Sequence, residues 1–489
     1  MDFHVSPTVR DQQTMKQVHD FIIIGSGASG SVIAHQLTSA GADVLMLEAG
    51  KRYSASTFPD NELDANAELM WNGGMDASAD ASTLFIRGKV VGGGTIINQC
   101  LLDRFDDIAL DSWQDRSGLE FFAQDKLSAH YDAVETNLSL HKMEQKDWNT
   151  NAELYVEGFE KMGFAWGPLR RGQSNCGSDN DCMTCLGGCP RASKQSMLET
   201  FIPLAEKQGL KIHSEFLVRE VIHGPHFVSI SGYHKQLPCT LYAKKVILAS
   251  GALGTTELLL RSRLQDRLPA LGQGFYCHPQ WMTVALFNDF IDSHKGAFQT
   301  VKSDEPRFRK AGFKLENVFA GPIAIGLLKS GYGFEHQRFM RRYRNMACIE
   351  VAVRDQDPGT ISLNNRDRLS ISKPLSDMDR QKADNGNQLV SDMFHTIGAS
   401  EVMTSPLQIG LHLMGGCAIG NNENQSVVNE SFQVHGMKNL YIADSSIFPD
   451  APGINPSLTI MALSHRASQS ILSDCGIHTT QQLTREAAI

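Results

Sequence analysis

The chain has 489 residues, of which 42% are hydrophobic, and a net charge of −9 that comes from 45 basic and 54 acidic residues. Its length exceeds what a single compact core usually holds, so we expect two packed domains. Because no long run of one charge occurs, nucleic acid and acidic membrane surfaces are unfavourable partners. No apolar stretch approaches the roughly 18 residues that span a bilayer, and residues 1–20 lack the apolar core of a secretion signal. We therefore expect a cytoplasmic protein without a transmembrane segment.

Residues 20–50 show the pattern of a βαβ unit that binds a dinucleotide. The pattern predicts a strand at 21–24, a glycine-rich turn at 25–30, a helix at 31–40 and a second strand at 44–47. The turn reads Gly-Ser-Gly-Ala-Ser-Gly, and its small residues let the backbone approach a pyrophosphate at the positive end of the helix. Glu48 follows the second strand, where a carboxylate accepts hydrogen bonds from a ribose hydroxyl and disfavours a 2′-phosphate.

Two later segments have the character of strands that join the same sheet. Residues 245–249 precede Ser250, Gly251 and an apolar helical pattern, and residues 439–443 end at Asp444. The nucleotide domain is then built from separated stretches of the chain. The residues between them, mainly 280–410, form a second domain over its open side, and a substrate is expected at the junction.

A second glycine-rich run, at 87–98, reads Arg-Gly-Lys-Val-Val-Gly-Gly-Gly-Thr-Ile-Ile-Asn. It resembles the second glycine signature of the glucose-methanol-choline (GMC) oxidoreductases, in which these glycines let the backbone lie against the flavin of FAD. The chain is similar to the same family in further blocks, at 246–252, 274–279, 410–417, 427–428, 436–446 and 455–459.

This resemblance implies an α/β fold: a Rossmann-like FAD-binding domain and a second, α+β domain that binds substrate and carries an antiparallel sheet. It assigns residues 15–110, 195–279 and 408–475 to the FAD domain and residues 111–194 and 280–407 to the cap domain. It also implies a set of residues around FAD: Gly25, Gly27, Ser29, Gly30, Glu48, Ala49, Gly92, Gly93, Thr95, Asn98, Val218, Ser250, Gly251, Asp444, Asn455 and Pro456. Some relatives attach FAD covalently through a His just before the signature Asn. This chain has Ile97 there, so non-covalent FAD is expected.

His412 and Asn455 are similar to the active-site pair of the family, which faces the reactive side of the flavin. Removal of hydride from a carbinol carbon requires the hydroxyl proton to leave, and an imidazole with a pKa of about 6.5 can accept it. The resemblance therefore implies that His412 is the base and that Asn455 orients the alcohol oxygen by hydrogen bonding. For His278, in the block at 274–279, a structural and a functional role are both open.

Four of the ten cysteines crowd into one segment: Cys176, Cys182, Cys185 and Cys189. The second half of this segment resembles the cysteine-rich segment of long-chain fatty-alcohol oxidases in the family. The spacing, with a proline after the last cysteine, is also typical of an iron-sulfur ligand run, which would relay electrons to a partner. Buried thiols that shape a loop and a zinc site are the alternative interpretations.

The resemblance implies an oxidase or dehydrogenase that uses FAD to convert an alcohol, expected to be a lipophilic primary alcohol, to the carbonyl compound. Oxygen, a quinone or a redox protein would take the electrons. Two alternatives stay open: a sugar or sterol dehydrogenase subunit with an iron-sulfur cluster, and a flavin-containing lyase of the same fold. The second domain also supplies apolar residues that either line a pocket or fill the core: Met282, Phe287, Phe290, Phe298, Phe313, Phe319, Phe334 and Met340.

Overall fold

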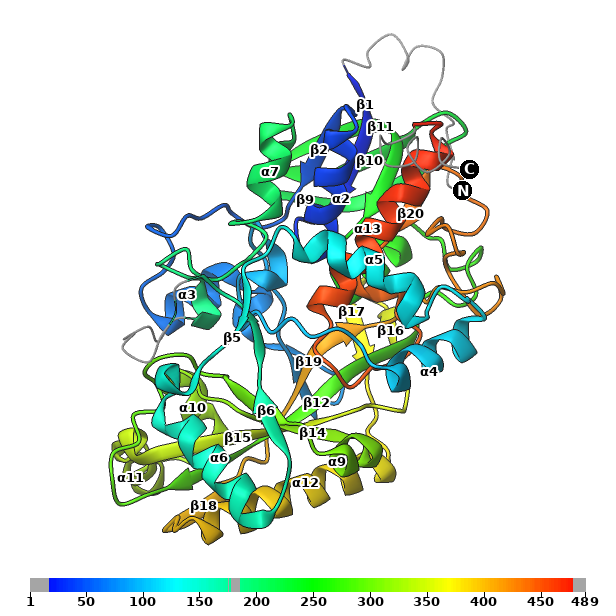
Figure 1. Cartoon of the computed structure of the whole chain (residues 1–489). Helices are drawn as coiled ribbons and strands as arrows, with labels where there is room; N and C mark the ends of the chain where they lie inside the picture. The colour runs from blue at the N-terminus through cyan, green and yellow to red at the C-terminus, as the bar shows by residue number, and fades with distance from the viewer. Residues whose placement is uncertain (1–16, 175, 177–184, 478–489) are drawn as a thin grey trace.

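The computed structural model describes residues 17–174, 176 and 185–477, and its strands form two large sheets (Figure 1). The seven-stranded sheet, in the upper part of Figure 1, has the strand order β8-β2-β1-β11-β10-β9, and β20 pairs with β11. Its strands are β1 (Val18–Ile24), β2 (Val44–Leu47), β8 (Lys211–His213), β9 (Phe216–His223), β10 (Val228–His234), β11 (Leu237–Leu248) and β20 (Leu440–Ile442). The strands predicted near residues 21, 44, 245 and 439 thus lie in one sheet, as the sequence indicated.

The central strands of this sheet are parallel because helices connect them. β1 pairs in parallel with β2 and β11, whereas β9, β10 and β11 form an antiparallel meander. α2 (Ala28–Ser39) follows β1 and packs against α7 (Phe201–Lys207) and α13 (Ser457–Asp474). β1 reads Val-His-Asp-Phe-Ile-Ile-Ile, and its last four residues are all buried, as expected for a central strand covered on both faces.

The eleven-stranded sheet lies below the first in Figure 1 and is mainly antiparallel. Its main path runs β3-β4-β19-β12-β15-β14-β13-β6, with β16, β17 and β18 attached to its side. Its strands are β3 (Asp76–Ala77), β4 (Thr83–Phe85), β6 (Trp166–Pro168), β12 (Gln273–Leu286), β13 (Val301–Ser303), β14 (Phe313–Asn317), β15 (Met346–Val353), β16 (Gly359–Leu363), β17 (Leu369–Ser372), β18 (Glu401–Thr404) and β19 (Gln408–Met414). Together, the two sheets confirm the predicted fold class.

The division at residue 279 crosses a continuous strand, because β12 runs from one side of the molecule to the other. The first half of β12 pairs with β16 and β19, and its second half pairs with β15 and β18. β3 and β4, which come from the stretch assigned to the FAD domain, also join this second sheet. The domain boundaries stay a prediction, since β12 lies wholly in the second sheet and yet crosses the expected boundary.

β15 shows how the second sheet separates its core from its open face. Alternate residues point to opposite faces of a strand, and all eight residues of β15 are buried. Ala347, Ile349, Val351 and Val353 pack in one cluster with residues of α6 (Thr150–Met162) and α12 (Asp377–Thr396). Met346 and Cys348 point the other way, toward α10 (Pro322–Leu328), and Glu350 belongs to this second face.

The remaining helices and strands surround these two layers. They are α3 (Glu62–Leu69), α4 (Asp107–Ser117), α5 (Gln124–Glu135), α8 (Gly251–Arg261), α9 (Pro306–Ala311), α11 (Phe334–Arg341) and the small β5–β7 pair (Leu140–Lys142 and Arg170–Gly172). Among the helices that the structure describes, none is long and apolar enough to cross a membrane.

Candidate active site

The loop between β1 and α2 requires glycine at defined positions. Gly25 has φ +106°, and a Cβ there would lie 2.3 Å from the carbonyl oxygen of Ala249. A Cβ on Gly30 would lie 2.0 Å from the carbonyl oxygen of Gly25, so only glycine lets the helix start this close to the strand. Gly27 is the N-cap of α2, and its backbone therefore faces whatever binds at the helix N-terminus.

The second glycine run packs directly against the first. The N–H of Gly92 donates to the hydroxyl of Ser26 at 2.9 Å, and a Cβ on Gly93 would come 2.9 Å from the Cα of Gly27. Thr95 donates its hydroxyl proton to the carbonyl oxygen of Gly92 at 2.6 Å. Two loops that are far apart in the sequence thus form one backbone surface with almost no side chains.

Glu48 is held by donors from the first loop. Its carboxylate accepts from the hydroxyl of Ser26 at 2.7 Å, from the N–H of Ser26 at 3.1 Å and from the N–H of Gly50 at 2.8 Å. Burial raises the pKa of Glu48, and these donors oppose that shift. Ser26 therefore connects Glu48 to the second glycine run, a role that the sequence did not reveal.

Asp444 joins the third segment of the nucleotide domain to the site. Its carboxylate accepts from the N–H of Gly251 at 2.8 Å, from the hydroxyl of Thr255 at 2.5 Å and from the N–H of Ser446 at 2.8 Å. The hydroxyl of Ser29 donates to the carbonyl oxygen of Ala443 at 3.0 Å. These bonds fix the β20 segment against the N-termini of α2 and α8.

A cavity of about 590 Å³ runs along these loops and on into the second sheet. Most of the residues predicted to contact FAD line it: Gly25, Gly27, Ser29, Glu48, Ala49, Gly93, Thr95, Asn98, Val218, Ser250, Gly251, Asp444, Asn455 and Pro456. Gly30 and Gly92 do not, because they pack behind the two loops. The side-chain-free walls fit a dinucleotide, since a Cβ at the close approach of the loops would fill the space.

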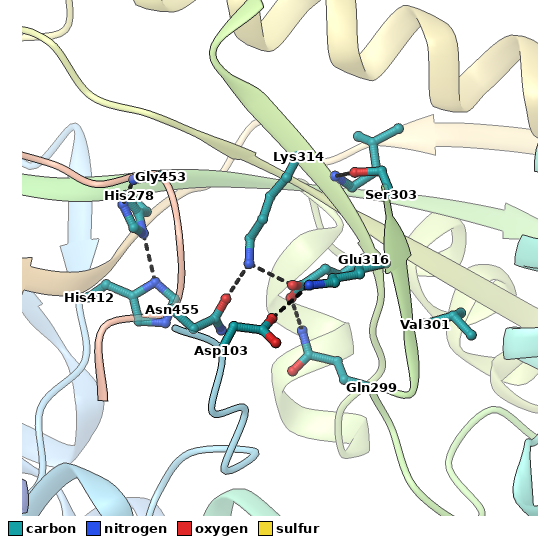
Figure 2. A network of polar contacts seen from close by, with 12 residues as sticks. Asp103, His278, Gln299, Val301, Ser303, Lys314, Glu316, His412, Gly453 and Asn455 are labelled. Carbon is teal, nitrogen blue, oxygen red and sulfur yellow. Dashed lines mark hydrogen bonds and ion pairs between the residues drawn. The ribbon is translucent and has the colours of Figure 1, made fainter. Parts of the chain in front are cut away.

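His412 lines this cavity, and the buried His278 contacts it from behind (Figure 2). His412 lies on β19 with φ +57°, next to an irregularity in the pairing of β12 with β19, and His278 lies on β12. Their Nδ1 atoms are 2.9 Å apart, and the N–H of Gly453 donates to His278 Nε2 at 3.0 Å. A residue with left-handed backbone dihedrals interrupts the regular alternation of side chains along a strand. Such irregularities are common next to active sites, where they redirect a side chain.

These contacts determine where the two imidazoles carry their protons. A backbone N–H can only donate, so His278 Nε2 is unprotonated and neutral His278 carries its proton on Nδ1. That proton is donated to His412 Nδ1, which places the proton of neutral His412 on Nε2. Burial and the nearby charge of Lys314 lower the pKa of His412 to about 3. Burial also holds the pKa of His278 well below its usual value, so both rings are neutral near pH 7.

Asn455, in the loop before α13, is bound by a lysine from the second sheet. Lys314 on β14 donates to Asn455 Oδ1 and, at 2.6 Å, to Glu316 Oε1 (Figure 2). Gln299 donates to the other oxygen of Glu316 at 3.2 Å. The side chain of Glu316 is fully buried, and that of Lys314 is 15% exposed.

Glu350 adds a second acid to this group of polar side chains. It lies opposite Glu316 in the pairing of β14 with β15, and it lines the cavity. Burial and the adjacent carboxyl of Glu316 hold the pKa of Glu350 well above its usual value. The charged form of Glu350 is therefore disfavoured, and Lys314 and Glu316 form the ion pair of this group.

The sequence reasoning did not identify Lys314, Glu316 or Glu350. The signal was present, because each is a charged residue at an alternate position of a short apolar strand, in Phe-Lys-Leu-Glu-Asn and Met-Ala-Cys-Ile-Glu-Val-Ala-Val. Charged side chains on the buried face of a strand are costly unless they are paired, so such positions indicate a polar site. Which other strand supplies the partners follows only from the sheet order.

Of the four clustered cysteines, Cys182 lies outside the described residues. The backbone N–H of Lys194 donates to Cys189 Sγ at 3.5 Å. The buried ammonium of Lys194 donates to the carbonyl oxygens of Cys185 and Asn98. Across the described part of the chain, no three or more His, Cys, Asp or Glu side chains are grouped so that they could hold a metal ion.

Comparison with known proteins agrees with this architecture. The N-terminal family model of the GMC oxidoreductases matches residues 19–280, and the C-terminal one matches residues 355–464. An uncharacterized GMC-type oxidoreductase of Sinorhizobium fredii is 28% identical over 96% of this chain and 97% of its own length. A long-chain-alcohol oxidase of Arabidopsis thaliana is 25% identical over 92% of this chain and 68% of its own.

Among solved structures, pyridoxine 4-oxidase from Mesorbium loti superimposes with a TM-score of 0.73 at 15% identity. The superposition covers 92% of this chain and 98% of that one, and at this identity it supports the fold alone. The two family models cover more than half of the chain. The chain therefore belongs to the GMC family of FAD-dependent oxidoreductases.

Proposed function

We propose that this protein oxidises an alcohol to the carbonyl compound at the end of the cavity where His412 and Asn455 meet. One observation carries the proposal: both residues line the same cavity as the loops that fit FAD. When bound, FAD supplies the acceptor for the hydride of the carbinol carbon. The relatives include the long-chain-alcohol oxidase of Arabidopsis thaliana and a cholesterol oxidase of Acinetobacter baumannii that is 24% identical to this chain, which supports an alcohol as the substrate.

His412 and Asn455 bind the reacting hydroxyl in this proposal. His412 Nδ1 is engaged by His278, which leaves Nε2 for the cavity. In the tautomer that His278 and Gly453 favour, Nε2 carries a proton and donates to the substrate oxygen. Such a donor stabilises negative charge on that oxygen as the hydroxyl proton leaves.

That His412 acts as the base stays a prediction, and this role requires the other tautomer of both histidines. His412 can accept the hydroxyl proton on Nε2 only when its own proton lies on Nδ1. His278 must then be protonated on Nε2, where the N–H of Gly453 now points. Substitution of His412 by Gln separates the two roles, because a Gln side chain can donate a hydrogen bond but cannot take up a proton.

We propose a lipophilic alcohol because the cavity beyond His412 has mainly apolar walls. All but Phe298 belong to the apolar cluster that includes Met346 and Cys348 on one face of the second sheet: Met282, Phe298, Val318, Phe319, Ile325, Leu328, Leu407 and Ile409. Met282, Phe298 and Phe319 were among the candidate pocket residues of the sequence. Phe287 and Phe313 belong to a core cluster instead, and Phe290 and Phe334 are exposed.

Oxygen is the acceptor that we propose for the electrons, since the named alcohol-specific relatives are oxidases. A quinone or a redox protein would make the enzyme a dehydrogenase instead. An iron-sulfur cluster at the cysteine segment would favour a protein acceptor. A lyase of the same fold would leave its flavin oxidised with every alcohol.

The test is an anaerobic titration of the purified holoenzyme with fatty, aromatic, sterol and sugar alcohols, followed by flavin absorbance. Bleaching by fatty alcohols supports the proposal, and re-oxidation on admission of air supports oxygen as acceptor. His412→Ala is the matched control, because it should keep its flavin but bleach far more slowly. Bleaching by sugars alone would contradict a lipophilic substrate, and no bleaching by any alcohol would favour the lyase. Acid treatment should release the flavin if it is bound non-covalently.

A further inference from the structure

We infer that Lys314 is a positioning residue that fixes the amide of Asn455 with its NH₂ group toward the substrate oxygen. The inference deepens the proposed function, on which it rests for the identity of that oxygen. It starts from a contact between a strand of the second sheet and the loop before a helix. Lys314 belongs to β14, and Asn455 precedes α13. Figure 2 shows the two side chains meeting beside His412.

The chemistry of the contact decides which way the amide points. An ammonium group can only donate, so the amide atom that faces Lys314 is the oxygen, Oδ1. The NH₂ group then lies on the opposite side of the planar amide. An asparagine without such a partner can exchange the two atoms by rotation, and the enzyme would then also present an acceptor to the substrate. Lys314 removes that second orientation.

Lys314 is itself held in place by the charged and polar residues behind it. Glu316 accepts from its ammonium at 2.6 Å, and Gln299 donates to the other carboxylate oxygen of Glu316. Both Lys314 and Glu316 occupy alternate positions of β14, so they share one face of the strand. Glu350 lies directly opposite Glu316 on β15, and burial disfavours its charged form.

Stability alone does not account for this arrangement. A buried ion pair contributes little net stability, and apolar residues of similar size often serve as well in a core. On the opposite side of the same two strands, Phe313, Leu315, Ile349 and Val351 pack in an apolar core cluster, and Asn317 of β14, which is polar, carries no charge. The charges occur only on the side that faces the cavity, where Lys314 reaches Asn455.

The result is a pair of donors directed at one position. The NH₂ group of Asn455 and the Nε2–H of His412 both serve an oxygen that gains negative charge during oxidation. Donors that are oriented before the reaction lower its barrier because they need no rearrangement. Loss of one such donor typically slows catalysis by about 10²- to 10³-fold, and loss of its orientation alone should cost less, about 10-fold.

The test is a double-mutant cycle between Lys314 and Asn455. Lys314→Met with Glu316→Gln removes the ion pair without leaving a buried charge, and the limiting rate of anaerobic flavin reduction is measured with the best alcohol of the panel. We expect this pair of changes to slow reduction about 10-fold in the wild type and less than about twofold in Asn455→Ala. Lys207→Met, which removes an exposed ammonium group of α7, should remain near the wild-type rate. Equal losses in both backgrounds, or no loss in the wild type, would overturn the inference.

A second measurement covers variants that react poorly. Binding of octanoate, whose carboxylate only accepts hydrogen bonds, is followed by the perturbation of flavin absorbance. Binding should weaken about 10-fold in Lys314→Met with Glu316→Gln, and the same pair of changes should weaken it less than about twofold in Asn455→Ala. If no alcohol reduces the wild-type flavin, the proposed function fails, but the octanoate cycle still tests the orientation of Asn455. A variant that retains flavin and its thermal midpoint but binds octanoate like the wild type would overturn the inference.

Discussion

His278 Nδ1 lies 2.9 Å from His412 Nδ1, and this contact places two neutral imidazoles in series behind the reacting position. The N–H of Gly453 orders the series, because it leaves His278 only one nitrogen on which to carry a proton. The orientation of that peptide is fixed in turn. Arg309 donates to the carbonyl oxygen of Pro452 at 2.8 Å and forms two bonds of 2.7 Å with Asp106.

From this relationship we predict different activities for two substitutions of His412. His412→Ala removes every hydrogen bond of the ring and should slow flavin reduction by about 10²- to 10⁴-fold. His412→Gln can still donate to the substrate oxygen and should be at least about 10-fold faster than His412→Ala. Stopped-flow absorbance with one alcohol compares the two. Equal rates for His412→Gln and His412→Ala would instead support the base role of His412. In that case the proton between the two Nδ1 atoms would lie on His412.

The same pair should make the folded protein sensitive to acid. Burial lowers the pKa of His412 to about 3 and that of His278 well below its ordinary value. In the unfolded chain both rings take up a proton as the pH falls below about 6.5, whereas in the folded protein they stay neutral. The free energy of unfolding should therefore fall by about 1.4 kcal/mol per pH unit for each histidine below pH 6.5.

Thermal midpoints of the holoenzyme between pH 5 and pH 8 measure this dependence. His278→Asn should show a shallower loss of stability at low pH than the wild type. The exposed His395 provides the control, and His395→Gln should follow the wild-type curve. Parallel curves for His278→Asn and the wild type would show that His278 takes up a proton in the folded protein.

Most of the residues predicted for the nucleotide-binding half of the site lie along one cavity, and local patterns encode their relative positions. Gly25, Gly27 and Glu48 belong to one βαβ unit, in which a strand, a turn and a helix fix their relative positions within 30 residues. The second glycine run and Asp444 were located through their resemblance to a family, not through periodicity. Even so, the hydroxyl of Ser26, which links Glu48 to Gly92, carries no signal of its own.

The substrate end of the site was harder to predict, because contacts between distant segments create it. Asn455 and Lys314 are separated by 141 positions, and Lys314 belongs to β14 whereas Asn455 lies in the loop before α13. The pairing of β14 with β15 brings Glu316 to Glu350, and no local pattern specifies that register. His278 was an ambiguous candidate for the same reason, since its two partners, His412 and Gly453, come from other segments.

Glu48 provides a direct test of the nucleotide site. Glu48→Gln replaces one acceptor oxygen with an NH₂ group, which then faces the donors of Ser26 or Gly50. A lost hydrogen bond to a buried group costs about 1 to 3 kcal/mol, so we expect FAD binding to weaken at least about fivefold. The ratio of flavin to protein after gel filtration measures the loss. Glu68→Gln, at an exposed position of α3, should keep the wild-type ratio, and full flavin content in Glu48→Gln would contradict the assignment.

Lys194 tests how the cysteine segment supports the flavin site. Its buried ammonium donates to the carbonyl oxygens of Ile96, Asn98 and Cys185, so it ties the second glycine run to the segment after the cysteines. Lys194→Met leaves these acceptors without a donor, and unsatisfied buried acceptors each cost about 1 to 3 kcal/mol. We expect a lower thermal midpoint and a loss of flavin, whereas Lys207→Met at an exposed position should change neither.

Iron analysis of the same anaerobic preparations distinguishes the interpretations of the cysteines. In the described residues, the backbone N–H of Lys194 donates to Cys189 Sγ, and the ammonium of Lys194 donates to the carbonyl oxygen of Cys185. These contacts fit a loop shaped by thiols. We therefore expect Cys189→Ser to keep its flavin and to reduce it within about twofold of the wild-type rate, with no stoichiometric iron in either protein. Iron that is present in the wild type and lost in Cys189→Ser would instead establish a cluster, and with it a route for electrons to a protein partner.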